Sequence, residues 1–170
     1  MAWLLRLVEG RSSSGECYPP TSFGYLVLMH ANSSSDVVYS YKYDARTRTA
    51  SSPTVLVKGM HNPGHTTRTL FISPSRPNHR VVAVGSNGNI DLTAATVDDK
   101  GKPKNGVTGT AQIRVFDLKK VKKVEGGVPY TEGGVLGYGL RNDVGIAEDR
   151  VGTVFSIGAY LFSIVLSEKR

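Results

Sequence analysis

The sequence predicts an all-β protein, and three observations lead to that prediction. Short runs rich in Val, Ile and aromatic residues recur along the chain, each run ends at Gly, Pro, Asn or Asp, and helical periodicity is nearly absent. A chain of 170 residues, 39% hydrophobic and 21% charged, is long enough for a domain with a sizeable core. Many short strands are typical of a sandwich, a barrel or a propeller, and the pattern alone does not choose between them.

The clearest strand is predicted in residues 35–45, where side chains alternate in character. Val38, Ser40 and Lys42 occupy one side of this segment, whereas Val37 and three tyrosines occupy the other, as in a half-buried strand. Five further strands are predicted in chain order: TVLVKGM (54–60), RTLFIS (68–73), RVVAVGS (80–86), AQIRVFDL (111–118) and GGVLGYGL (133–140).

Residues 117–126, written DLKKVKKVEG, are the exception to the strand pattern. Leu118, Val121 and Val124 are spaced to line one face of one or two helical turns. The lysines of this segment and the terminal SEKR supply much of the net charge of +7. No aromatic residues are interleaved with them, as a stacking platform for single strands requires, so we interpret them as a solvated surface and expect no nucleic-acid partner.

The two ends of the chain carry apolar segments that are too short for a membrane span of about 20 residues. The first run is interrupted by Arg6 and does not resemble a secretory signal. Residues 154–166 are interpreted as a buried strand or helix, or as sequence foreign to the domain. Cys17 is the only cysteine, which excludes an internal disulfide and a cysteine-based zinc cluster.

Three constellations contain residues suited to chemistry. GHTTRTL holds His65 and Arg68, VGSNGNID spans 84–91, and GYGLRNDVGIAED spans 137–149. A neutral histidine accepts a proton near pH 7, an arginine binds a carboxylate, and Asn-Gly turns bring amide groups close to a ligand. Taken separately each is weak, because a histidine before a strand is usually structural and SNGN is usually a hairpin turn.

Taken together and in this order, GHTTRTL, VGSNGNID, QIRVFDL and LGYGLRNDVGIAED resemble the soluble quinoprotein glucose and sorbosone dehydrogenases, in particular the fungal branch with the pyranose dehydrogenases. The resemblance covers residues 25–156 and implies part of a six-bladed β-propeller that binds pyrroloquinoline quinone near its axis, usually with calcium. At ~40–45 residues per blade, about three to four blades are expected. Residues 1–24 match poorly, and residues 157–170 form an atypical tail.

The resemblance also implies the roles of individual residues. His65 corresponds to the general base that takes the proton of the sugar hydroxyl as hydride passes to the quinone. Arg141 and Asn142 correspond to residues that hold the polar edge of the cofactor, with Arg141 also counted in the catalytic site. Asn87 lies beside the quinone, and Arg68 supports the same strand. No residue of this chain is matched to a calcium ligand.

The implied activity is quinone-dependent oxidation of a pyranose, sorbosone or another aldose or ketose, with a cytochrome or a dye as electron acceptor. Members of the family are typically secreted, so an extracellular location is expected, and Asn32 in NSS fits the N-glycosylation sequence. Two alternatives stay open: a catalytically inactive propeller fragment from a truncated gene model, acting at most as a binding module, and a lactonase-like propeller hydrolase. For the hydrolase, Asp91, Asp98 and Asp99 show no recognisable spacing of metal ligands.

Overall fold

The computed structural model describes residues 2–6, 26–31, 36–44, 47–89, 99, 109–158 and 162–165. Within these ranges nearly all regular structure is β, and the strands are β1 (Ala2–Arg6), β2 (Leu26–Ala31), β3 (Val38–Asp44), β4 (Thr49–Ala50), β5 (Thr54–Lys58), β6 (Arg68–Ile72), β7 (His79–Val84), β8 (Gln112–Asp117), β9 (Val128–Pro129), β10 (Gly134–Tyr138), β11 (Asp143–Glu148), β12 (Val154–Gly158) and β13 (Phe162–Val165). The helices are α1 (Leu118–Val121) and the 3-10 helix η1 (Tyr130–Glu132). The described residues contain no helix that is both long and apolar enough to cross a membrane.

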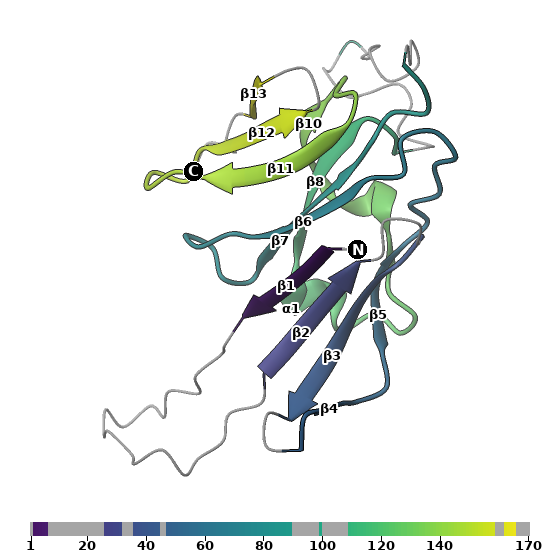
Figure 1. Ribbon diagram of the computed structural model, residues 1–170, viewed down its shortest axis with the longest axis vertical. Helices are drawn as coiled ribbons and strands as arrows, with labels where there is room; N and C mark the ends of the chain where they lie inside the picture. The colour runs from purple at the N-terminus through teal and green to yellow at the C-terminus, as the bar shows by residue number, and fades with distance from the viewer. Residues whose placement is uncertain are drawn as a thin grey trace.

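The strands form three sheets that lie next to one another in chain order (Figure 1). The first has the order β1-β2-β3-β5-β9, with β4 paired to β3, the second has the order β10-β8-β7-β6, and the third has the order β11-β12-β13. The strand that opens the second sheet, β6, contacts both β1 and β11, which open the other two. Meandering sheets placed side by side through their first strands are the arrangement of successive propeller blades.

The all-β prediction is therefore confirmed, and each strand predicted between residues 35 and 140 is present. The three sheets agree with the lower end of the expected three to four blades. Parts of both ends of the chain also form strands, because β1 pairs with β2 and β13 pairs with β12.

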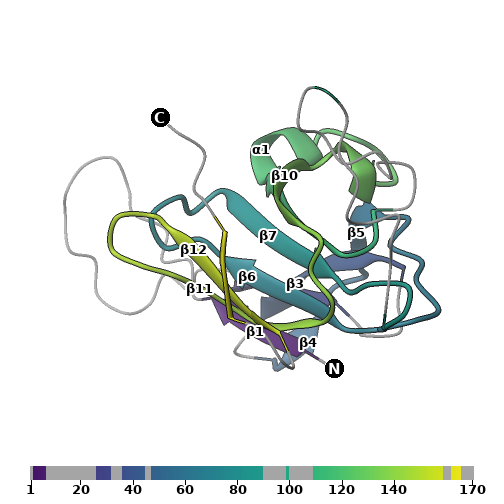
Figure 2. The same ribbon diagram turned by 90° about the horizontal axis from the view of Figure 1, so that it is seen from above.

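The packing of β7 explains its uninterrupted apolar sequence. Val82 and Val84 belong to the hydrophobic core shared with the first sheet, whereas Val81 and Ala83 belong to the core shared with Val154 of the third sheet. Figure 2 shows β6 and β7 between β3 on one side and β11 and β12 on the other. A strand buried on both faces carries apolar residues at every position rather than at alternate positions.

The helical segment is shorter than its pattern indicates. Asp117 caps α1, its Oδ1 accepting a hydrogen bond of 2.9 Å from the backbone N–H of Lys119, and Leu118 and Val121 are buried. The prediction that Val124 lies on the same buried face is wrong, since its side chain is 46% exposed. The helix has ended by then, and the positive φ of Gly126 turns the chain toward β9.

Candidate functional site

Three loops meet at one end of the second sheet and contain the residues proposed for the site except Arg68, which is the first residue of β6. Residues 61–67 precede β6, residues 85–89 follow β7, and residues 139–142 connect β10 to β11. Because β6 and β7 are antiparallel, the start of one lies at the same edge as the end of the other. The topology of the sheet thus brings together segments that are far apart in the sequence.

The buried side chain of Asn62 joins the first loop to the second. Its Nδ2 donates to the backbone oxygens of Gly85 at 2.6 Å, His65 at 3.0 Å and Ser86 at 3.1 Å. Its Oδ1 accepts from the backbone N–H of Gly64 at 3.0 Å. One amide therefore satisfies backbone groups of both loops and holds the His65 segment against the end of β7.

Ser86 connects all three loops through its backbone. Its carbonyl accepts from the N–H of His65 at 2.9 Å, and its N–H donates to the carbonyl of Arg141 at 2.6 Å. The relative position of His65 and Arg141 is consequently set by main-chain hydrogen bonds that run through one residue.

The imidazole of His65 is held through one of its two nitrogens. Nδ1 lies 3.0 Å from Ser86 Oγ and 3.3 Å from Ser86 O, and the residue is half-buried. Nε2, the other ring nitrogen, takes no part in these two contacts. A histidine oriented in this way is suited to act as a proton acceptor.

Arg68, the first residue of β6, supports the His65 loop from below. Its buried guanidinium donates to the backbone oxygens of Met60 at 2.5 Å, Thr67 at 2.9 Å and His65 at 3.4 Å. Burial lowers the pKa of Arg68, and the charges of Tyr130 and Asp36 oppose that effect. Its contacts are those of a residue that stabilises a loop rather than one that reaches a ligand.

The third loop presents a cation and an amide. The exposed Arg141 donates a hydrogen bond from its guanidinium to Asn89 Oδ1. Asn142 is half-buried, and its Oδ1 has no hydrogen-bond partner among the described residues. Asp143, which follows, anchors β11 because its Oδ1 accepts from Ser156 Oγ at 2.7 Å, while burial raises the pKa of its carboxyl.

Two glycines allow the loops to approach so closely. A Cβ on Gly85 would lie 2.8 Å from the Cβ of His65 and 3.3 Å from Asn142 Oδ1, so His65 and Asn142 both pack against this glycine. A Cβ on Gly64 would lie 2.3 Å from the backbone of Asn87. The structure therefore brings all the predicted site residues together, with the side chain of Asn87 at the exposed rim.

We expect Gly85→Ala to separate the His65 loop from Asn142. The added methyl would meet the Cβ and the carbonyl oxygen of His65, and that oxygen is held by hydrogen bonds from Asn62 and Arg68. The free energy of unfolding should therefore fall by about 1–3 kcal/mol, the usual cost of overpacking. Denaturant unfolding measures this fall. Gly88→Ala is the matched control in the same loop, since its Cβ would meet nothing within 4 Å, and equal effects of the two substitutions would contradict the prediction.

Sequence reasoning missed three residues that organise these loops. Ser86 and Asn89 belong to the SNGN motif, in which the resemblance points to Asn87 alone, and Asn62 stands before a Pro-Gly turn. Asn in such a position often bonds to the backbone nearby, which was a usable signal. The long-range bonds to Gly85 and Ser86 carried no local signal.

The donor set suits an anionic ligand better than a metal ion. An imidazole, a guanidinium and side-chain amides surround one edge, and arginine binds carboxylates through two parallel hydrogen bonds. Among the residues that the structure describes, no three His, Cys, Asp or Glu side chains are grouped as metal ligands. Asp91 and Asp98 lie outside the described residues, and Asp99 is exposed.

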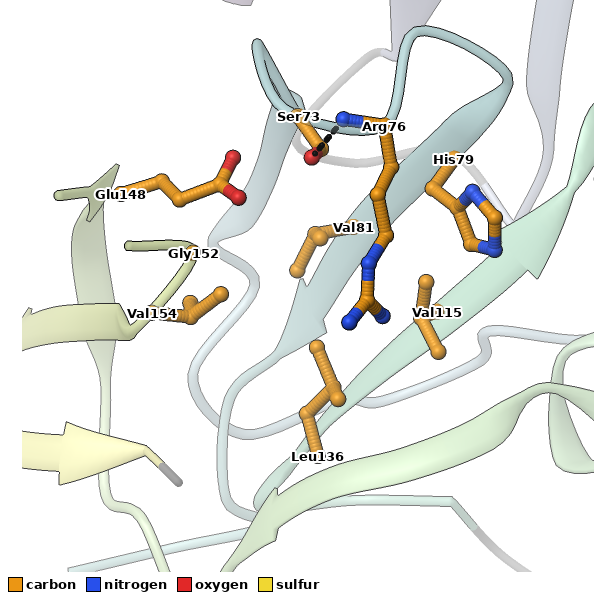
Figure 3. Close-up of a pocket in the computed structure, with 9 residues that line it drawn as sticks. All are labelled: Ser73, Arg76, His79, Val81, Val115, Leu136, Glu148, Gly152 and Val154. Carbon is orange, nitrogen blue, oxygen red and sulfur yellow. Dashed lines mark hydrogen bonds between the residues drawn. The ribbon is translucent and has the colours of Figure 1, made fainter. Parts of the chain in front are cut away.

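A small cavity lies at the opposite end of β6 and β7 (Figure 3). Arg76 points into it between Val81 and Val115, with Glu148 and His79 on either side. Its volume of about 20 Å³ suits roughly one water molecule. This cavity is separate from the three loops and from the residues proposed for the site.

Comparisons with known proteins agree with this arrangement. A family model described as TrAA12-like matches residues 29–167. A pyrroloquinoline quinone-dependent pyranose dehydrogenase of Coprinopsis cinerea is 47% identical over 127 residues, which are 74% of this chain and 16% of that protein. A pyrroloquinoline quinone-dependent sugar dehydrogenase of Hypocrea jecorina (strain QM6a) is 32% identical over 123 residues, which are 71% of this chain and 26% of that protein.

Two solved structures are similar in fold. The holo form of the pyranose dehydrogenase PQQ domain from Coprinopsis cinerea has a TM-score of 0.61 and 36% identity, covering 86% of this chain and 35% of that chain. The calcium structure of a Trichoderma reesei carbohydrate-active enzyme of family AA12 has a TM-score of 0.65 and 29% identity, covering 79% of this chain and 31% of that chain. The chain thus spans about a third or less of the proteins it resembles.

Proposed function

Because the chain belongs to the TrAA12-like family, we propose that it forms part of a dehydrogenase that oxidises a sugar with pyrroloquinoline quinone. The names of its relatives support this proposal, since both are quinone-dependent dehydrogenases of pyranoses or sugars. The chain matches only part of each relative, so the activity is proposed for the whole protein that contains it. The three loops are its contribution to the site.

The convergence of the loops at Ser86 and Gly85 is the observation that carries the proposal. It places a candidate base, His65, beside the candidate anion-binding residues Arg141 and Asn142. Alcohol oxidation by hydride transfer needs a proton acceptor and an oriented electron acceptor in one place. Residues 65 and 141 are far apart in the chain, so their meeting is not a consequence of local sequence.

His65 is proposed to take the proton of the sugar hydroxyl on Nε2. The ring is held through Nδ1, so Nε2 is the atom that can reach a substrate oxygen at about 3 Å. Pyrroloquinoline quinone would, when bound, accept hydride from the carbon that bears this hydroxyl. Two different groups therefore accept the proton and the hydride, and His65 accepts only the proton.

Arg141, Asn142 and Asn87 are proposed to hold the quinone. The cofactor carries carboxylates, for which the guanidinium of Arg141, oriented by Asn89, is a suitable partner. The buried Oδ1 of Asn142, which has no partner among the described residues, would be satisfied by a donor on a bound ligand. These features fit the cofactor, although Arg68 is too deeply engaged with backbone oxygens to join them.

The remaining parts of the proposal rest on the family. The substrate is a pyranose, sorbosone or another aldose or ketose, the electron acceptor is a cytochrome or a dye, and the protein is extracellular. Calcium is proposed as a second cofactor because a related structure of family AA12 is a calcium structure. No residue of this chain is assigned to that ion.

Titration of the full-length protein with the quinone tests the proposal. We expect stoichiometric binding visible in cofactor absorption, and reduction of a dye that depends on added sugar. Chelation of calcium should lower this activity, and calcium should restore it. Quinone binding without sugar-dependent dye reduction would support the binding module instead, and absence of quinone binding would overturn the assignment.

A further inference from the structure

Ser86 touches His65 through its side chain as well as its backbone. Its Oγ lies 3.0 Å from His65 Nδ1, and the residue is 3% exposed. We propose that Ser86 is a positioning residue that fixes the tautomer of His65, with the proton on Nδ1 and the lone pair on Nε2. The catalytic consequence rests on the proposed function, whereas the tautomer itself does not.

The single hydroxyl hydrogen of Ser86 decides the direction of the contact. Ser86 Oγ donates to the backbone oxygen of Gly88 at 2.7 Å, and a carbonyl oxygen can only accept. With its hydrogen committed there, Ser86 Oγ can only accept from His65. Nδ1 must then be the donor, and in a neutral imidazole the other nitrogen, Nε2, is left without a hydrogen.

A second contact points the same way. The backbone oxygen of Ser86 lies 3.3 Å from His65 Nδ1, and it too can only accept. Both neighbours of Nδ1 are therefore acceptors. The opposite tautomer would require the Ser86 hydroxyl to turn toward the ring and give up its hydrogen bond to Gly88. Because one hydrogen bond is then lost, the Nδ1–H form should be about tenfold more populated.

Backbone hydrogen bonds to the neighbouring loops fix the position of Ser86 beside the ring of His65. Its N–H is bonded to the Arg141 carbonyl at 2.6 Å, and its carbonyl accepts from both His65 N and Asn62 Nδ2. The Ser86 side chain starts from a backbone that is fixed on both sides. Burial of Ser86, which is 3% exposed, also limits competition by bulk water for its hydroxyl.

This arrangement prepares His65 for proton transfer. The lone pair on Nε2 accepts the proton of the sugar hydroxyl, and the resulting imidazolium keeps its Nδ1–H bonded to the two Ser86 oxygens. A serine oxygen orients the ring without placing a formal charge beside it. It therefore raises the basicity of the imidazole less than a carboxylate in the same place would.

Nitrogen chemical shifts of His65 test the tautomer without quinone or sugar. In full-length protein labelled with ¹⁵N-histidine, long-range ¹H–¹⁵N spectra of the neutral imidazole should show a protonated Nδ1 and an unprotonated Nε2. The signals are assigned by their loss in His65→Gln. The wild-type spectrum alone decides the point, and a proton found on Nε2 would overturn the proposal.

Three variants then test whether Ser86 is the cause. Ser86→Ala should move both His65 shifts toward a tautomer mixture and lower kcat about tenfold with little change in KM, and Ser86→Thr, which keeps the hydroxyl, should restore much of both. Ser73→Ala is the control: it removes another buried serine hydroxyl, one that accepts from Arg76 N at 2.9 Å at the other end of β6, and the shifts should not change. Unchanged shifts in Ser86→Ala would refute the role of the Ser86 hydroxyl, because the backbone oxygen of residue 86 remains in that variant.

The outcomes separate this proposal from the proposed function. A wild-type protein with Nδ1–H that binds no quinone would leave the Ser86 proposal standing and remove the function. A protein that oxidises sugar while His65 carries its proton on Nε2 would support the proposed function and overturn the Ser86 proposal.

Discussion

Replacing His65 by alanine is expected to lower the rate of sugar oxidation by about 10²–10⁴-fold while leaving quinone binding nearly unchanged. The imidazole is proposed to act on the proton alone, and the hydrogen bonds described for its ring go to Ser86 rather than to Arg141 or Asn142. The loop itself is held by Asn62 and Arg68 through backbone oxygens, which the substitution does not remove. The loss should therefore fall on kcat.

The measurement is sugar-dependent dye reduction in the full-length protein, with quinone affinity from an absorption titration. His61→Ala is the matched control, because His61 lies in the same segment but is 77% exposed and contacts Asp36 instead. It should keep both activity and binding. An equal loss of binding and turnover in His65→Ala, or turnover that does not change, would contradict the general-base role and indicate that His65 is structural.

Replacing Arg141 by alanine is expected to weaken quinone binding by about 10- to 100-fold. A hydrogen bond from a guanidinium to a carboxylate contributes about 1.5–3 kcal/mol. The side chain of Arg141 is exposed, and its guanidinium is oriented by a hydrogen bond to Asn89. Arg141→Lys should recover only part of the affinity, since an ammonium keeps the charge but cannot form two parallel bonds. Stability should change little in either variant.

Dissociation constants from the same absorption titration measure this effect, and denaturant unfolding checks stability. Arg150→Ala removes an exposed arginine in the turn between β11 and β12, outside the three loops, and is the matched control for the loss of one positive charge. If Arg150→Ala weakened binding as much as Arg141→Ala, the effect would be one of net charge, and Arg141 would lose its assigned role.

Local sequence determined most of the secondary structure. The apolar run of β7 appears directly in the chain, because side chains of a strand alternate between two faces and both faces of β7 are buried. The motifs around His65, Asn87 and Arg141 identified the same residues that the fold gathers. The helical segment shows the limit of periodicity, since Val124 fits the spacing but follows the end of α1 and is exposed.

Only the tertiary structure decided how those motifs act on one another. Asn62, Ser86 and Gly85 became visible as organising residues through hydrogen bonds and close approaches between segments that are 20 or more residues apart. Such contacts depend on the register of β6 against β7 and on the position of the loop that connects β10 to β11. Neither of these is encoded in a short window of local sequence. The direction of the bond between Ser86 and His65 depends in turn on a third group, the Gly88 carbonyl, and is set only when all three are in place.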